Sequence, residues 1–183
     1  MPALIFLLSC LHSQLEHGTD SLVCRFAVVN VMERCRSQLI RVFNTDILVQ
    51  KVHSVLEKSI DPIARSLALR AFASMAELLV NNLRVHSQVR NALRSPNATE
   101  QTACTLCVQQ LSEHSPSFAQ GSVGLIGRLV TALETPMNQR LQLIAILQHM
   151  HRDPATVLES RRVLQEVIER MRMCIYMYMF IYI

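Results

Sequence analysis

The sequence predicts an all-α fold built as a stack of antiparallel helix pairs, and three observations lead to this prediction. Half of the 183 residues are hydrophobic, while only 4 are Gly and none is Trp, a composition that favours long helices over turn-rich sheets. Apolar residues recur at i, i+3, i+4 and i+7, which is the spacing of one helix face. Helix-capping residues followed by proline recur between these apolar segments.

Capping residues followed by proline are expected to open helices. The side chain of Ser, Thr or Asp accepts a hydrogen bond from an amide of the first turn, and the next residue can be Pro because its missing N–H would have had no helical partner. Asn97, three residues before Glu100, predicts an approximate capping box. The expected starts are Asp61-Pro62, Ser115-Pro116, Thr135-Pro136 and Asp153-Pro154, with two more at Thr19-Asp20 and Thr45-Asp46.

Four helix pairs are predicted, over residues 3–34, 45–80, 83–113 and 117–151, with one further helix from Asp153. Short links between consecutive helices make them antiparallel neighbours. A helical extension or short linker helix is expected over 38–43. The apolar stripes expected to face the core in the last two helices are Met137, Leu141, Ile144 and Leu147, then Leu164, Val167, Ile168 and Met171.

Equivalent positions recur at a regular interval. The Leu-Glu pair and Asp at 15, 16 and 20 recur at 56, 57 and 61, which is 41 residues later, and Pro62 and Pro136 are two steps of 37 apart. A two-helix period of this length fits HEAT-type repeats better than the shorter tetratricopeptide period. We therefore expect residues 1–172 to form an α-solenoid domain of HEAT/armadillo-like helix pairs, about four pairs plus one helix.

Residues 173–183 are expected to form an atypical hydrophobic tail, because their Met, Tyr and Ile residues leave no polar helix face. From this composition we expect a truncated or misread coding sequence. At the other end, the apolar run from Met1 to Leu11 has no positively charged first segment, so a first helix is favoured over a signal peptide. No apolar run reaches the roughly 18 residues that cross a bilayer, and no membrane contact is expected.

Cysteine and histidine residues suggest sites, but their spacing favours structural roles. The six cysteines lie in apolar helical patterns, which fits a reducing compartment better than a disulfide framework. Cys104 and Cys107 share a helix face without a second pair to complete a metal site, so buried thiols are expected. His149 and His151 would diverge by about 200° on a helix, so they are not expected to share a metal. A cationic or hydrogen-bonding role near a helix C-terminus is favoured there. No cofactor is expected.

Catalytic motifs are absent from the sequence, which has no phosphate-binding loop and no nucleophile with an adjacent base. The chain carries a net charge of +4, and its arginines concentrate near two helices. Solvated faces and inter-repeat salt bridges are favoured there, with an RNA-contacting surface as the alternative. The arginines are Arg84, Arg90 and Arg94, then Arg161, Arg162, Arg170 and Arg172.

The segment 59–68 resembles the HEAT second-helix signature, in which Asp61-Pro62 opens the helix and Arg65 follows. This resemblance implies that Arg65 reaches the equivalent Asp of a neighbouring repeat. Thr135 and Pro136 are expected to be part of the same structural repeat signature.

Four segments resemble the Integrator subunit 7 family: residues 43–46, 59–76, 112–119 and, most distinctively, 133–153, which reads LETPMNQRLQLIAILQHMHRD. The resemblance implies a nuclear, non-catalytic scaffold that contacts other subunits of the Integrator complex. Because the last segment includes His149 and His151, the resemblance also implies an interaction surface at these two residues. It also implies roles in small nuclear RNA 3′-end processing, attenuation of transcription by RNA polymerase II, and the DNA damage response. An importin-like transport or adaptor solenoid is a further alternative, because fold does not fix function.

Overall fold

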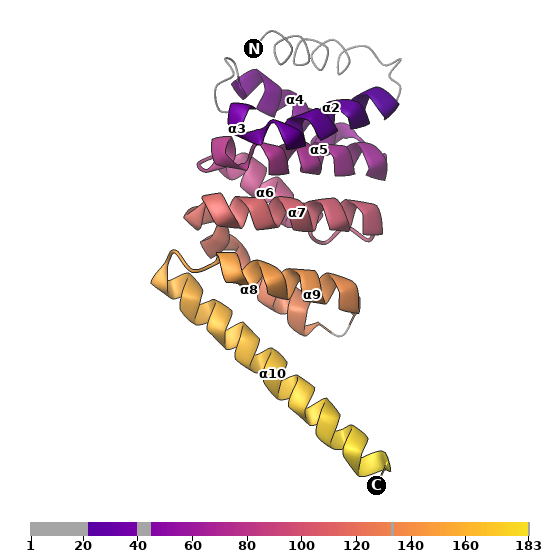
Figure 1. The fold of residues 1–183 in the computed structure, drawn as a ribbon, viewed down its shortest axis with the longest axis vertical. Helices are drawn as coiled ribbons and strands as arrows, with labels where there is room; N and C mark the ends of the chain where they lie inside the picture. Colours follow the sequence, from indigo (N-terminus) through magenta and orange to yellow (C-terminus); the bar gives the residue numbers. More distant parts are fainter. Residues whose placement is uncertain (1–21, 40–44, 133, 183) are drawn as a thin grey trace. The chain divides into compact units, whose positions relative to one another are not determined.

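The computed structural model describes residues 22–39, 45–132 and 134–182. Regular structure throughout these ranges is helical (Figure 1), which confirms the all-α prediction. The helix expected to begin at residue 3 and the start at Thr19-Asp20 lie outside the described residues. The helices divide between two compact units, Met1–Ser115 and Pro116–Ile183.

The first unit contains three helix layers and the helices that pack beside them. In Figure 1, α2, α5 and α7 form successive layers, with α5 between the other two, while α4 packs on α5 and α6 packs on α7. The neighbouring pairs α4–α5 and α6–α7 are compatible with stacked helix pairs. The elements are α2 (Leu22–Arg34), α3 (Arg36–Leu39), α4 (Thr45–Lys58), α5 (Pro62–Ser74), the 3₁₀ turn η1 (Ala76–Leu79), α6 (Leu83–Ala92) and α7 (Ala98–His114).

The core of the first unit is densest around α5, because α5 is packed on more than one side. Leu69 and Phe72 of α5 are fully buried, as are Leu111 of α7 and Val89 of α6. Alanines at positions 64, 68, 71 and 73 of α5 are also buried. These small side chains bring the neighbouring helices close to α5, so the core buries aliphatic surface from all three layers.

The second unit contains α8 (Pro116–Thr131), α9 (Met137–Ile146), the 3₁₀ turn η2 (Leu147–His149) and α10 (Pro154–Tyr182). Both α9 and α10 pack against α8. The approach of α10 is close at Gly127, where an added Cβ would lie 2.7 Å from Val163 Cγ2. None of the described helices is long and apolar enough to cross a membrane.

The expected core face of α9 is wrong for its first half. Met137 and Leu141 are exposed, whereas Gln139, Leu143 and Ile146 are buried. Apolar residues lie on more than one side of this helix, so periodicity alone could not choose the buried side. Leu147, at the end of the expected stripe, is buried as predicted.

The expected core face of α10 is also displaced. Thr156, Ser160 and Val163 are buried, and these residues follow one another at i, i+4 and i+7. Leu164, Ile168 and Met171 are exposed, and Val167 is half-buried. A Cβ added at Gly127 would lie 2.7 Å from Val163 Cγ2, which places Val163 in the contact with α8. The buried Thr156 and Ser160 lie on the same side of α10 as Val163.

Candidate functional site

Asp61 and Pro62 of the repeat signature form the amino end of α5. Pro62 is its first residue, and the carboxylate of Asp61 accepts hydrogen bonds from the amides of Ile63 and Ala64 at 3.1 and 3.2 Å. This cap satisfies two amides that have no carbonyl partner within the helix. The signature therefore positions α5, and its first turn places Arg65 toward the next layer.

Arg65 connects three segments of the first unit. Its Nε and Nη2 donate to Glu100 Oε1 of α7 at 3.0 and 2.7 Å, and its Nη1 donates to the carbonyl of Leu56 at the end of α4. The expectation that Arg65 pairs with an Asp equivalent to Asp61 is wrong, because the residue at the N-cap of α7 is Asn97, which carries no charge. The buried carboxylate of Glu100 supplies the ion pair instead.

Glu100 accordingly does not close the expected capping box. Asn97 Oδ1 caps α7 by accepting from the amides of Thr99 and Glu100, but the amide of Asn97 donates to Ser95 Oγ. The Ser95 hydroxyl in turn donates to Glu100 Oε2 at 2.9 Å. The carboxylate is thus taken up by Arg65 and Ser95, because a buried charge needs close partners.

A second ion pair joins α5 to α2. Arg70 donates through Nε and Nη2 to both carboxylate oxygens of Glu33, each at 2.8 Å, and through Nη2 to Asn30 at 3.0 Å. The bond to Glu33 raises the pKa of Arg70. The guanidinium also lies 5.2 Å from the ring centroid of Phe26, a cation–π contact.

These polar contacts share a sequence separation close to the length of one repeat. Arg65–Glu100, Arg70–Glu33 and the bond from Ser115 Oγ to the Val80 carbonyl join residues 35 to 37 positions apart. Glu33, Arg70 and Glu100 were not identified from the sequence as partners. A search for opposite charges separated by one repeat would have found them.

Thr135 and Pro136 lie in the loop between α8 and α9. The helix begins at Met137, one residue later than expected, and Pro136 occupies the N-cap position without a side-chain cap. Arg140 Nη2 donates to the carbonyls of Ala132 and Thr135 at 2.8 and 3.2 Å. Arg140 therefore holds this loop against the first turn of α9.

His149 and His151 lie at the junction of η2 with α10. His151 is exposed, and its Nδ1 lies 2.9 Å from the Gln148 carbonyl, while His149 is half-buried with Nε2 3.1 Å from Gln148 Nε2. Met150 between them is buried. Among the described residues, no three His, Cys, Asp or Glu side chains are grouped to hold a metal.

Cys104 and Cys107 are both fully buried in α7. Cys104 Sγ donates to the Val89 carbonyl at 3.3 Å. Burial raises the pKa of both thiols, strongly so for Cys104. Since the thiolate is the reactive form, this environment favours unreactive core residues.

Several of the arginines considered for RNA contact are paired with carboxylates. Arg84 lies 3.6 Å from Glu57, Arg162 lies 2.6 Å from Glu159, and Arg170 lies 2.8 Å from Glu166. Arg170 also donates to the carbonyl of Thr131. These pairs reduce the positive charge that the two helices present to solvent.

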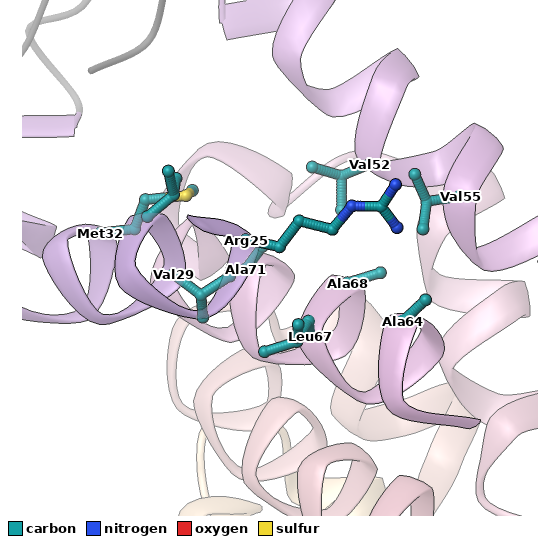
Figure 2. Close-up of a pocket in the computed structure, with 10 residues that line it drawn as sticks. Arg25, Val29, Met32, Val52, Val55, Ala64, Leu67, Ala68 and Ala71 are labelled. Carbon is teal, nitrogen blue, oxygen red and sulfur yellow. The ribbon is translucent and has the colours of Figure 1, made fainter. Parts of the chain in front are cut away.

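An apolar cavity lies between α2, α4 and α5 (Figure 2). Its walls come from Val29 and Met32, from Val52 and Val55, and from the small residues of α5. The side chain of Arg25 extends across it, with its guanidinium close to Val52 and Val55 in Figure 2. With a volume of about 50 Å³, the cavity is smaller than those that bind small aromatic molecules, which are about 150 Å³.

Exposed apolar side chains are a distinctive feature of the second unit. Val157, Leu164, Ile168 and Met171 of α10 are all exposed. Their spacing of seven, four and three residues places them on one side of the helix. We call these four residues the α10 stripe. Large exposed apolar surfaces commonly mark protein interaction sites.

Comparison with known proteins identifies the family. The family model "Integrator complex subunit 7, N-terminal" matches residues 19–180. Integrator complex subunit 7 of Gallus gallus is 33% identical over 144 residues, and that of Homo sapiens is 31% identical over the same length, covering 79% of this chain in each case. The Dictyostelium discoideum homolog is 28% identical over 151 residues, or 82% of the chain. The match spans about 15% of the length of each of these relatives. The chain therefore belongs to the Integrator complex subunit 7 family, in its N-terminal region.

Proposed function

We propose that this chain is a non-catalytic scaffold module of the nuclear Integrator complex that contacts other subunits of that complex. Through these contacts it would support small nuclear RNA 3′-end processing and attenuation of transcription by RNA polymerase II. Family membership supports the assignment to the complex. The observation that carries the scaffold role is the α10 stripe, an apolar surface of the kind that partner proteins cover.

The test is capture of partners from nuclear extract with the tagged chain, followed by mass spectrometry. The wild-type chain should retain Integrator subunits. The double variant Leu164→Glu, Ile168→Glu should retain at least tenfold less, because two charges replace apolar surface at the contact. Gln165→Glu, an exposed position on the same helix, is the matched control. Failure of the wild-type chain to retain any Integrator subunit would contradict the proposal. Equal retention by the double variant would exclude the α10 stripe as the contact.

We also propose that residues 1–172 form a domain of HEAT-type repeats and that residues 173–183 form a separate tail. Two observations count against a boundary at residue 173: α10 continues to Tyr182, and the family match extends to residue 180. His149 and His151 are proposed as a second contact surface. The exposed ring of His151 supports it, and His151→Ala should lower subunit retention in the same capture experiment.

A further inference from the structure

We propose that Thr135 is a phosphorylation site for a proline-directed protein kinase, and that Arg140 and the amino end of α9 hold the phosphate. This goes beyond the scaffold function and does not depend on it. The sequence contains three Ser/Thr-Pro dipeptides, Ser95-Pro96, Ser115-Pro116 and Thr135-Pro136. The structure distinguishes among them by what each hydroxyl contacts.

Two of the three hydroxyls are already engaged in the fold. Ser115 is completely buried, and its Oγ donates to the Val80 carbonyl at 2.8 Å. Ser95 Oγ donates to Glu100 Oε2 and accepts from the amide of Asn97. A phosphate on Ser95 would therefore meet the Glu100 carboxylate, and like charges at that distance repel.

Thr135 differs from both serines. It is half-buried in the α8–α9 loop and is followed by an exposed Pro136, which a kinase can contact. Its hydroxyl makes no hydrogen bond within the part of the chain that the structure describes. Phosphorylation at this position would thus break no side-chain hydrogen bond among the described residues.

Arg140 provides a cation beside this loop. Its partners in the described ranges are the neutral carbonyls of Ala132 and Thr135, and its buried Nε has no hydrogen-bond partner. By contrast, Arg65 and Arg70 each direct Nε and Nη2 toward a carboxylate. Because guanidinium binds phosphate oxygens with the same paired geometry, Arg140 can turn toward a phosphate on Thr135.

The amino end of α9 provides a second favourable contact. The helix is ten residues long, and its N-cap is Pro136, which has no side chain able to cap it. The first-turn amides therefore remain available to an anion. Glu134 is an exposed neighbouring carboxylate, and Arg170 reaches the other end of the loop at the Thr131 carbonyl while pairing with Glu166. Arg140 and the helix end outweigh the single exposed Glu134.

In the reaction, Thr135 Oγ1 attacks the γ-phosphorus of ATP held by the kinase. The bond from that phosphorus to the β–γ bridging oxygen breaks, ADP leaves, and the hydroxyl proton passes to the catalytic carboxylate of the kinase. The product carries roughly two negative charges two residues before the exposed side chain of Met137.

The experiment treats the 183-residue chain with a proline-directed kinase and ATP and maps the phosphate by mass spectrometry. We expect Thr135 to be modified at least tenfold faster than Ser95 or Ser115. A synthetic peptide spanning 129–141 shows whether the kinase accepts the sequence. Modification of the peptide but not the folded chain would overturn the proposal, and so would absence of phosphate from both, or equal modification of Ser115.

The role of Arg140 is tested by the effect of the phosphate on the melting temperature. Phosphorylation should raise the Tm of the wild-type chain by about 2 °C, since a favourable anion at a helix end contributes up to about 1 kcal/mol. The rise should be lost in Arg140→Gln, each variant being compared with its own unmodified form. Arg128→Gln, an exposed arginine near the end of α8, is the control. An equal rise in Arg140→Gln would overturn the role given to Arg140.

Discussion

Leu67 and Leu141 show how strongly the consequence of one substitution depends on its place in the fold. Leu67 lies in α5 and is 5% exposed, whereas Leu141 lies in α9 and is 58% exposed. The apolar pattern predicted that Leu141 faces the core, as Leu67 does. The structure corrects this expectation for Leu141.

Leu67→Asp should destabilise the chain by about 4 kcal/mol or more, because an unpaired carboxylate would be buried among aliphatic side chains. Leu141→Asp should change the free energy of unfolding by about 0.5 kcal/mol at most, since its side chain faces solvent. Chemical denaturation followed by circular dichroism measures both. A similar loss of stability in the two variants would show that the α9 face is misassigned.

His86 makes stability depend on pH. The ring is fully buried with Nε2 2.8 Å from the Leu79 carbonyl, and burial lowers its pKa below the ordinary value of 6.5. In acid the unfolded chain binds a proton that the folded chain does not, so the free energy of unfolding should fall as pH falls below about 6.5. The pKa of His53 is also lowered, mainly by burial, so His53 likewise makes the free energy of unfolding fall as pH falls.

Denaturation curves between pH 7.5 and 5.5 in wild type and His86→Gln test this dependence; both limits are roughly one pH unit from the histidine pKa. The variant should lose less stability across this interval, because it lacks one of the groups that bind protons only when unfolded. A pH dependence as steep as that of wild type would contradict the role of His86.

At the scale of single helices, the α8–α10 contact depends on the absence of a side chain at Gly127. An added methyl would lie 2.7 Å from Val163 Cγ2, whereas nothing lies within 4 Å of the corresponding position at Gly124. Gly127→Ala should therefore lower Tm by about 2–6 °C, as crowding of about 1–3 kcal/mol exceeds the gain in helix propensity.

Gly124→Ala is the matched control for this prediction. It should raise Tm by about 2 °C, because Ala favours the helix by up to about 1 kcal/mol without contacting α10. Differential scanning calorimetry compares the two variants. A rise in Tm for both would mean that Val163 moves away at little cost.

Helix starts were predicted more accurately than helix faces, for a physical reason. A cap depends on neighbouring residues, and Asp61, Asn97 and Asp153 each accept hydrogen bonds from the first turn of the helix that follows. A buried face depends on which neighbour packs there. On α10, the close contact at Gly127 selected Val163 over the larger Leu164.

At the scale of the whole molecule, the all-α class followed from composition and periodicity, but the ion pairs between layers did not. The partner of Arg65 is Glu100, 35 residues away, and no local motif specifies such a distance. Likewise the exposure of the α10 stripe depends on what packs against α10, which its own sequence does not contain.

The net charge of +4 gives a prediction for nucleic acid binding. Because several arginines are paired with carboxylates, RNA retention should be weak, with few phosphate contacts and a shallow dependence on salt. Binding of a labelled single-stranded RNA measured between 50 and 200 mM salt tests this, a range over which extensive phosphate contacts lose roughly a thousandfold or more in affinity. A steep slope with tight binding at low salt would favour the RNA-contacting alternative.

The buried thiols of α7 have a consequence for kinetics. Cys104 and Cys107 are inaccessible in the native state, whereas Cys35 is only partly covered. A pulse of alkylating reagent should label Cys35 quickly and should reach the other two only when α7 separates from its neighbours. The labelling rate of Cys104 and Cys107 would then report how often this repeat opens, and their modification would trap the opened form, since neither modified side chain fits back into the core.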